Sequence, residues 1–242
     1  MTPSPAVCGC SLSERDCGVP DPVPTSKLPK SSDPAVILKQ LTIVPVHFTV
    51  ARAVLVAHHY LHSIAAGTQL CFGVFVRNSL MGAITLGAGP FLAYQLVDQA
   101  GQNDCLTLTR FWLDDRLPRN SESKALGILL KALKTNTRLK FLVSYADPTL
   151  GHVGTIYEAT NWVYTGLSQA TPVYSLGDGK LHHSRSLAHA FGTHSVPYLK
   201  ELKVPIGVVI QPGKHRYLYF LDSRWRSRLL APVLPYPKRV TP

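Results

Sequence analysis

Groups that can carry out chemistry gather in one stretch of this sequence, between residues 120 and 164. The stretch contains a carboxylate at Asp147, an imidazole at His152 and a phenol at Tyr157, together with several hydroxyls. Asp147 lies two residues after the end of the apolar run of residues 141–145, so we expect it at the carboxyl end of a buried strand. Carboxylates and phenols placed in this way serve as general bases and acids. The stretch therefore indicates an active site.

The two main candidates also have ordinary structural interpretations. Asp147 precedes Pro148, and this pair of residues commonly forms a turn. Tyr157 falls in a short helix expected from about residue 153 to residue 160, where a tyrosine usually packs in the core with its hydroxyl at the rim. The local sequence leaves both alternatives open.

A helix is expected from about residue 121 to residue 136, and its start could hold an anion. Asn120 or Ser121 is a suitable N-cap residue. The unpaired N–H groups of a helix start suit an anionic ligand, for which Ser123 and Lys124 add a donor and a charge. The same residues would equally cap a surface helix. Binding of a cofactor by the segment from Asn120 to Gly127 therefore stays a hypothesis.

Hydrophobic patterning predicts a mixed α/β (α+β) fold. We expect one domain over residues 36–230, preceded by a disordered, proline-rich tail over residues 1–35 and followed by a short tail over residues 231–242. The order of elements is similar to that of the GNAT acetyltransferases, which have a mixed, mostly antiparallel central sheet flanked by helices and use acyl coenzyme A. Strands are expected near residues 41–46, 70–76, 80–86, 106–113, 141–145, 162–165 and 217–221.

The charge of the chain favours a polyanionic partner. Its formal net charge is +11, and we expect double-stranded DNA to be that partner. No apolar run is long enough for a membrane span and the N-terminus lacks a signal sequence, so we expect a cytoplasmic protein without a membrane partner. The predicted DNA contacts are His59, Tyr60, Arg185, Lys214, Arg216 and Arg224.

Two histidines have the spacing of metal ligands. His58 and His62 are four residues apart in an expected helix, which would place both imidazoles on one face. No Glu accompanies them as in a zinc protease, and histidine-rich helix ends also line nucleic-acid surfaces. The sequence leaves both roles open.

Several segments resemble, in order and spacing, the Mom family of phage DNA-modification proteins. They are His58-His59-Tyr60, Leu108-Thr109-Arg110, Asn120-Ser121-Glu122-Ser123, Ser144-Tyr145-Ala146-Asp147 and the run from Gly151 to Gly166.

This resemblance implies conversion of the N6 amine of adenine in DNA to an N6-carbamoylmethyl derivative, which protects phage DNA from host restriction. It places catalysis on Asp147 and Tyr157, with Arg110 and Ser121 in support. It also raises iron as a cofactor, with Asp147 as an oxygen ligand. Acetyl transfer alone would not supply the nitrogen of the added group, so the small-molecule donor stays open.

Two other functions stay open at this stage. An acyl coenzyme A transferase acting on a small molecule or a protein would explain the fold and the helix start but not the basic charge. A DNA-binding protein without catalytic activity would leave Asp147 and Tyr157 unexplained.

Overall fold

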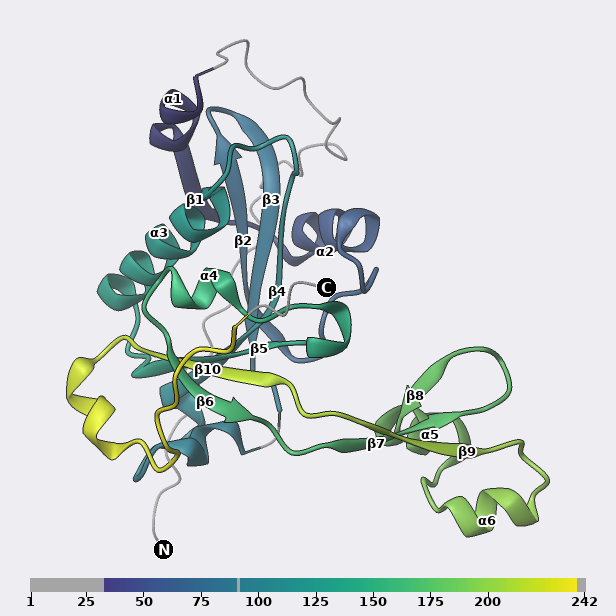
Figure 1. Cartoon of the computed structure of the whole chain (residues 1–242). Coiled ribbons are helices and arrows are strands. Elements are labelled where there is room, and N and C mark those ends of the chain that lie inside the picture. The colour runs from purple at the N-terminus through teal and green to yellow at the C-terminus, as the bar shows by residue number, and fades with distance from the viewer. Residues whose placement is uncertain (1–32, 91, 239–242) are drawn as a thin grey trace, which may run out of the picture.

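Seven strands form the central sheet of the computed structural model, which describes residues 33–90 and 92–238 (Figure 1). Their order is β1-β2-β3-β4-β5-β10-β6, and every neighbouring pair is antiparallel except the parallel pair of β4 and β5. The predicted mixed, mostly antiparallel sheet flanked by helices is confirmed. The strands are β1 (Leu41–Pro45), β2 (Thr68–Val76), β3 (Ser79–Gly87), β4 (Cys105–Leu113), β5 (Phe141–Ala146), β6 (Val163–Leu167) and β10 (His215–Phe220).

The parallel pair is short. It runs only from Cys105 opposite Phe141 to Leu108 opposite Ser144, whereas β4 continues to Leu113. The two strands therefore separate toward their carboxyl ends, in the middle of the sheet.

Two helices cover opposite faces of the sheet (Figure 1). Helix α3 (Ser121–Asn136) has the bounds that the sequence predicted, and its buried leucines pack with strand residues such as Ile84 and Leu142 in the main core. Helix α2 (Phe48–His58) buries Ala51 and Leu55 against Ala83 on the other face. Because successive strand residues point to opposite faces, Ala83 and Ile84 belong to different layers.

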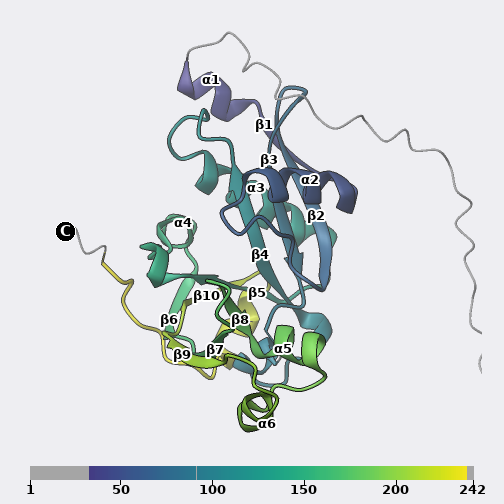
Figure 2. The ribbon, with the colours of Figure 1, turned by 90° about the vertical axis from the view of Figure 1, so that its right-hand side faces the viewer.

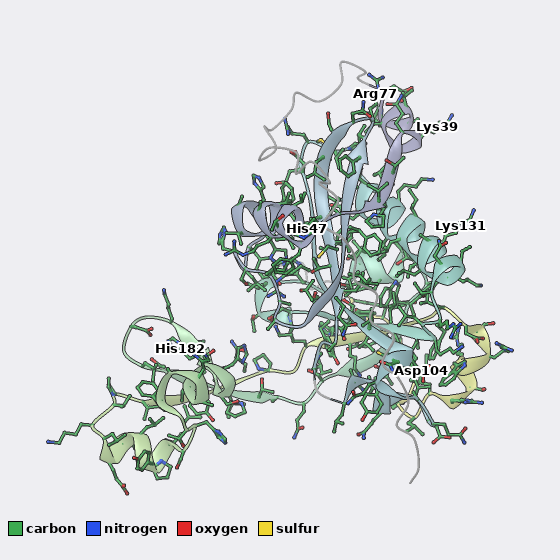
Figure 3. All side chains as sticks on the ribbon, turned by 180° about the vertical axis from the view of Figure 1, so that it is seen from behind. Lys39, His47, Arg77, Asp104, Lys131 and His182 are labelled. Atoms are coloured by element: carbon green, nitrogen blue, oxygen red, sulfur yellow. The ribbon has the colours of Figure 1, made fainter. Side chains whose placement is uncertain are left out.

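Residues 171–211 form a projection that the sequence did not predict, which we call the arm. It contains a three-stranded sheet in the order β8-β7-β9 and a core of its own made of Tyr174, Leu187, Leu199 and Ile206. Figures 1 and 3 show the arm standing away from the seven-stranded sheet, with His182 labelled on it in Figure 3, whereas in Figure 2 the arm points toward the viewer. Its elements are β7 (Thr171–Ser175), β8 (Leu181–His183), α5 (Ser184–Phe191), α6 (Val196–Glu201) and β9 (Gly207–Gln211).

The remaining elements are short. They are α1 (Pro34–Lys39), α4 (Thr155–Glu158) and the 3-10 helices η1 (Ala93–Leu96), η2 (Gln102–Asp104), η3 (Pro148–Leu150) and η4 (Ser223–Arg228). Helix α1 starts within the expected N-terminal tail, because Asp33 caps it by accepting a hydrogen bond from the N–H of Ala35. None of the helices in the described part of the chain has the length and apolar content needed to cross a membrane.

Part of the expected C-terminal tail is bound to the domain. The N–H of Leu234 donates to the carbonyl of Tyr164 at 2.9 Å, and the hydroxyl of Tyr236 donates to the carbonyl of Trp162 at 2.6 Å. The rest of the two predicted tails, residues 1–32 and 239–242, lies outside the described residues.

A buried tyrosine holds the loop that follows β5. The hydroxyl of Tyr217 donates to the carbonyl of Val153, and its ring lies directly against Gly154. Gly154 has a φ of +77°, and a Cβ there would lie 2.5 Å from the ring of Tyr217. Gly151 has a similar φ of +71°, but a Cβ there would meet no atom within 4 Å.

These two glycines form a matched pair for a stability test. Both Gly151→Ala and Gly154→Ala should cost about 1 kcal/mol because an L-residue is strained in the left-handed region. Gly154→Ala should cost a further ~1–3 kcal/mol, since the new methyl group must displace Tyr217. Urea unfolding of both variants measures the difference, and equal losses would show that Tyr217 does not hold the loop.

Candidate active site

A hollow of about 450 Å³ opens where β4 and β5 separate. Strand β4 supplies one wall, and the end of β5 with the loop into α4 supplies the other. The mouth lies next to the segment that follows α2. The lining residues are His59, Tyr60, Leu108–Leu113, Asp115, Glu122, Tyr145–Asp147 and His152–Tyr157.

Two hydroxyls lie together where the pairing of β4 and β5 ends. The hydroxyl oxygens of Tyr157 and Ser144 are 2.7 Å apart, and the Oγ of Ser144 lies 3.3 Å from the carbonyl oxygen of Leu108. Burial raises the pKa of Tyr157 to about 12, so this phenol stays protonated at neutral pH and can donate a proton. Ser144 was not predicted as a site residue, because a serine inside an apolar strand gives no separate signal.

Arg110 brings a partly buried positive charge to the same hollow. Its Nε donates to the carbonyl of Ser63 at 3.0 Å, and its Nη1 donates to the carbonyl of Thr109 at 2.7 Å. Among the described residues it forms no ion pair with a carboxylate. Burial lowers the pKa of Arg110, but a guanidinium stays charged in proteins. The arrangement suits an anionic or carbonyl oxygen of a ligand.

Asp147 lines the hollow, as expected of an active-site carboxylate, and it also caps the turn that begins with Pro148, as expected of an Asp-Pro pair. It accepts hydrogen bonds from the N–H and the hydroxyl of Thr149, at 3.0 and 2.6 Å, and its Oδ2 lies 2.8 Å from the Nζ of Lys214. Burial raises the pKa of Asp147, but the hydrogen bonds from Lys214 and Thr149 outweigh burial and hold it below the usual value. The carboxylate is therefore ionised at neutral pH.

Aromatic rings stack at the mouth of the hollow. Tyr60, which is 52% exposed, stacks on His59 at 4.3 Å and on His152 at 5.8 Å between ring centroids. His59 is buried, and burial together with the charge of Arg110 lowers its pKa to about 4. Its imidazole is therefore neutral at physiological pH. The column of rings offers a flat surface to a planar ligand.

The predicted metal pair is wrong in its geometry. Helix α2 ends at His58, His59 is extended, and His62 has a φ of +45°, so His58 and His62 do not share a helix face. His58 instead stacks on Trp112 at 4.6 Å, and the third candidate, Asp147, pairs with Lys214.

Within residues 33–90 and 92–238, no group of three or more His, Cys, Asp or Glu side chains is placed to hold a metal ion. The spacing of His58 and His62 would place both imidazoles on one face only if the helix continued past His58. The sequence does not show that the helix ends there.

The start of α3 was predicted to bind an anionic cofactor group and to place Ser121 in the active site, and the structure differs from this prediction in part. Asn120 is the N-cap residue, but it has a φ of +71° and its side chain makes no capping hydrogen bond. The hydroxyl of Ser121 is buried and donates to the carbonyl of Pro118 at 2.6 Å, and Ser121 does not line the hollow. Asn120 and Lys124 do not line it either.

A second hollow lies between α3 and α4 and contains two predicted cofactor residues. Ser123 and Gly127 line it, and Lys131 and Lys134 add two ammonium groups from the next turns of α3. A Cβ on Gly127 would meet no atom within 4 Å, so the space beside it is open. Glu122 of α3 lines the first hollow, and the next residue, Ser123, lines the second. The two hollows therefore lie next to each other.

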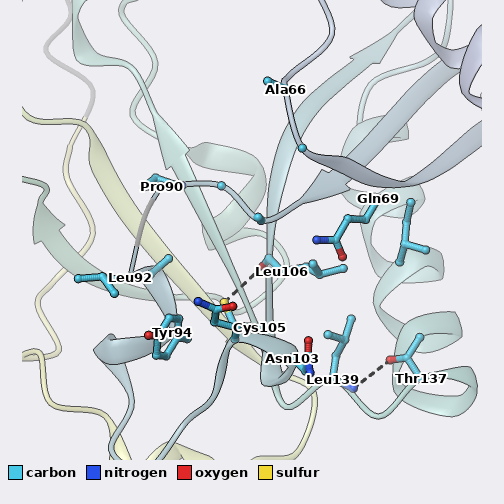
Figure 4. A pocket seen from close by; sticks show the side chains of 16 residues that line it. Ala66, Gln69, Pro90, Leu92, Tyr94, Asn103, Cys105, Leu106, Thr137 and Leu139 are labelled. Carbon is cyan, nitrogen blue, oxygen red and sulfur yellow. Dashed lines mark hydrogen bonds between the residues drawn. The ribbon is translucent and has the colours of Figure 1, made fainter. Parts of the chain in front are cut away.

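A third hollow, of about 570 Å³, contains no predicted site residue. It lies at the opposite end of β4, around Gln69, Leu106 and Leu139 (Figure 4). Arg110, Asp147 and Tyr157 line the hollow between β4 and β5 and do not line this third one.

The predicted DNA contacts do not form one surface. Arg224 pairs with Asp222 at 2.8 Å in η4, which follows the far end of β10, about 17 Å of strand away from His215. The Nε of Arg216 donates to the hydroxyl of Thr165 at 2.9 Å. The side chain of Arg185 lies outside the described part of the structure. His59, Tyr60 and Lys214 are the predicted contacts that lie at the first hollow.

Comparison with known proteins decides the family. The model of the Mom protein family matches residues 40–238, which include the whole seven-stranded sheet and the arm. The chain belongs to the Mom family. A Mom-family relative, the methylcarbamoylase mom of Escherichia phage Mu, is 31% identical over 207 residues, which are 83% of this chain and 85% of the relative.

Solved structures similar to this Mom-family chain include two acetyltransferases. An N-acetyltransferase from Staphylococcus aureus Mu50 matches with a TM-score of 0.41 and 10% identity, over 75% of this chain and 97% of that one. A putative acetyltransferase from Salmonella typhimurium, yncA with its cofactor acetyl-CoA, matches with a TM-score of 0.44 and 9% identity, over 76% and 95%.

Replacing Lys214 tests the electrostatics of this Mom-family site. Lys214→Met removes the ammonium group, so the pKa of Asp147 should rise toward or above its ordinary value of about 3.9. In the wild type the folded-state pKa is depressed, so Asp147 contributes stability that is present above its unfolded pKa. This stability is lost as the pH falls through the folded pKa.

The variant should therefore lose less free energy of unfolding on the acid side than the wild type. Urea unfolding between about pH 2 and pH 6, together with NMR titration of the Asp147 carboxyl carbon, measures both effects. Lys200→Met, at an exposed lysine of α6, is the control and should leave the titration unchanged. An unchanged Asp147 pKa in Lys214→Met would show that the ion pair does not form.

Proposed function

We propose that this Mom-family protein modifies adenine in double-stranded DNA, replacing a hydrogen of the N6 amine by a carbamoylmethyl group. The hollow between β4 and β5 is its catalytic pocket. One observation carries this proposal: the guanidinium of Arg110, the carboxylate of Asp147 and the phenol of Tyr157 line a single hollow with stacked rings at its mouth. The name of the phage Mu relative, a methylcarbamoylase, supports the same reaction. In a phage, such a product would protect DNA from host restriction.

The adenine must leave the base stack to reach this pocket. Enzymes that act on the atoms of a base extrude it and hold it between aromatic side chains, at a cost of a few kcal/mol. Tyr60 is exposed and stacks with His59 and His152, so this group of rings offers a stacking partner to a purine at the mouth of the pocket. The net charge of +11 supplies attraction to the phosphates.

The reaction needs a proton acceptor, a proton donor and a group that binds the carbamoyl oxygen. The N6 nitrogen forms a bond to the methylene carbon of the donor while the bond from that carbon to the leaving group breaks. Ionised Asp147 and neutral His59 are available to accept the proton that N6 loses. Tyr157 gives a proton to the leaving group, and Arg110 binds the carbamoyl oxygen.

The second hollow suits the anionic part of an acyl coenzyme A donor. Lys131 and Lys134 are spaced i, i+3 on α3, so their ammonium groups lie on one side of the helix, and Ser123 adds a hydroxyl. Open space beside Gly127 leaves room for the ligand. Such a donor would reach the catalytic pocket past Glu122 and Ser123. An acyl coenzyme A carries its thiol on the carbonyl carbon, so ammonia would have to replace the thiol there, which forms the carbamoyl group and releases free coenzyme A. The N6 amine would then displace a separate leaving group from the methylene carbon. Acetyl coenzyme A has neither that leaving group nor the nitrogen.

Mass spectrometry of nucleosides tests the function directly. DNA from cells that express the protein should contain a deoxyadenosine heavier by a carbamoylmethyl group in place of one hydrogen, and DNA from cells with empty vector should not. Identical nucleosides in the two samples would contradict the proposal.

Tyr157→Phe removes only the phenolic hydroxyl and should lower the rate of modification by about 10²–10⁴-fold, the usual contribution of a general acid. The modified deoxyadenosine formed per unit time, measured with equal amounts of protein, gives the rate. Tyr198→Phe on the arm, where the tyrosine is half exposed, is the matched control and should keep full activity. Full activity in Tyr157→Phe, with unchanged stability, would remove this phenol from the mechanism.

Reversing both charges in the second hollow tests the donor site. The double variant Lys131→Glu with Lys134→Glu should bind coenzyme A at least roughly tenfold more weakly, because two cations that face its phosphates become anions. Isothermal titration calorimetry measures the affinity, and the double variant Lys200→Glu with Lys203→Glu in the arm, which changes the net charge by the same amount, is the control. Equal affinities in the double variant and the wild type would place the donor elsewhere.

An acyl coenzyme A transferase that acts on a small molecule or a protein is the second candidate, and the lysine-lined hollow is the observation that favours it. It predicts that acetyl coenzyme A is consumed in the absence of DNA when an amine acceptor is present. The adenine-modifying enzyme predicts that donor turnover depends on DNA. Measuring release of free coenzyme A with and without DNA separates the two.

A further inference from the structure

Strand β9 of the arm leaves a long apolar edge uncovered. It pairs with β7 over its whole length, and no strand in the described residues pairs with its other edge. Val208, Val209 and Ile210 are 51%, 44% and 65% exposed. Since neighbouring side chains of a strand point to opposite faces, both faces of β9 are apolar and uncovered.

The strand lacks the features that normally keep an edge from pairing. Natural edges carry charged residues, proline or a bulge. The five residues of β9, GVVIQ, include no charge and no proline, and their register with β7 has no shift. The opposite edge of the same sheet, β8, is only three residues long, and His182 on it is bound to Asp178 at 2.8 Å. Of the two edges, β9 is the one suited to receive another strand.

We infer that β9 pairs in antiparallel fashion with β9 of a second copy of this chain, across a two-fold axis at Val209. In this register Val209 faces Val209 of the second copy, and Val208 faces Ile210. The strand is therefore complementary to itself, as the interface of a two-fold dimer requires. The pairing also brings no like charges together.

The arm gains structure from this partner. Its three-stranded sheet rests on a core of four buried side chains, which is little for a projecting unit. Two arms joined through β9 form one six-stranded sheet that adds main-chain hydrogen bonds and places the exposed valines and Ile210 beside apolar side chains of the second copy. DNA does not fit this edge, because a polyanion needs cations and β9 carries none.

The arrangement leaves the catalytic pocket free. The arm stands away from the seven-stranded sheet (Figures 1 and 3), so the paired edges lie outside the hollow between β4 and β5. This dimer does not depend on the proposed reaction, and its test uses no activity measurement.

Sedimentation velocity of the full-length protein over a range of concentrations tests the dimer. The wild type should sediment as a dimer, and Val209→Lys, which places two ammonium groups at the axis, should weaken dimerisation by roughly tenfold or more. The matched control is Leu181→Lys on β8, where the leucine is 50% exposed at the other edge of the same sheet. It should stay dimeric.

Two double variants test the register. Val208→Lys with Ile210→Glu should remain dimeric, because each new ammonium group faces a carboxylate of the second copy. Val208→Lys with Ile210→Lys should be monomeric. These variants differ only at residue 210, so they decide the question even if Val209→Lys fails to fold. A monomeric wild type, a dimeric Val209→Lys, or equal behaviour of the two double variants would overturn the inference.

Discussion

The separation of β4 from β5 is the constraint on which the rest of this structure depends. Parallel pairing stops at Leu108 and Ser144, although β4 continues to Leu113. The backbone groups released there need other partners, since buried polar groups are costly when unpaired. The contact of Ser144 with the carbonyl of Leu108, and with the phenol of Tyr157, meets part of that need. The pocket that we propose to be catalytic is the space that the separation leaves.

The pocket and the arm meet at Lys214. Its Nζ binds the carboxylate of Asp147, its N–H donates to the hydroxyl of Ser168 at 2.9 Å, and its carbonyl accepts from the N–H of Ser168 at 2.8 Å. Ser168 and Lys214 stand where the chain enters and leaves the arm. One residue thus links the charge of the pocket to the root of the arm.

Long amphipathic elements could be predicted from the sequence, whereas features set by tertiary contacts could not. The four buried leucines of α3 give a clear helical period, and its bounds were predicted to the residue. The arm was missed in part because β7 (TPVYS) and β8 (LHH) contain neither an apolar run nor a regular alternation of polar and apolar residues. The helix face expected to carry both His58 and His62 does not form because α2 stops at His58, a boundary that no proline or glycine marks.

The candidate site was also predicted only in part, because local sequence patterns locate the ends of strands and helices but not the contacts between distant segments. Asp147 and Tyr157 end a strand and start a helix, positions that sequence patterns locate, and both line the pocket. Ser121 was predicted as a site residue because it lies at the start of a helix, but its hydroxyl donates a hydrogen bond to the carbonyl of Pro118. The neutral state of His59 depends on burial and on Arg110, about fifty residues away in the sequence, which no local pattern reports.

The account rests on adenine entering the opening between β4 and β5, and photo-crosslinking measures this most directly. Duplex DNA that carries 8-azidoadenine at its adenine positions would be irradiated with the full-length protein, and the attached peptides identified by mass spectrometry. The account predicts crosslinks to peptides that contain Tyr60, Trp112 or Tyr157. Crosslinks confined to the hollow around Gln69 and Leu106, or to η4, would contradict it.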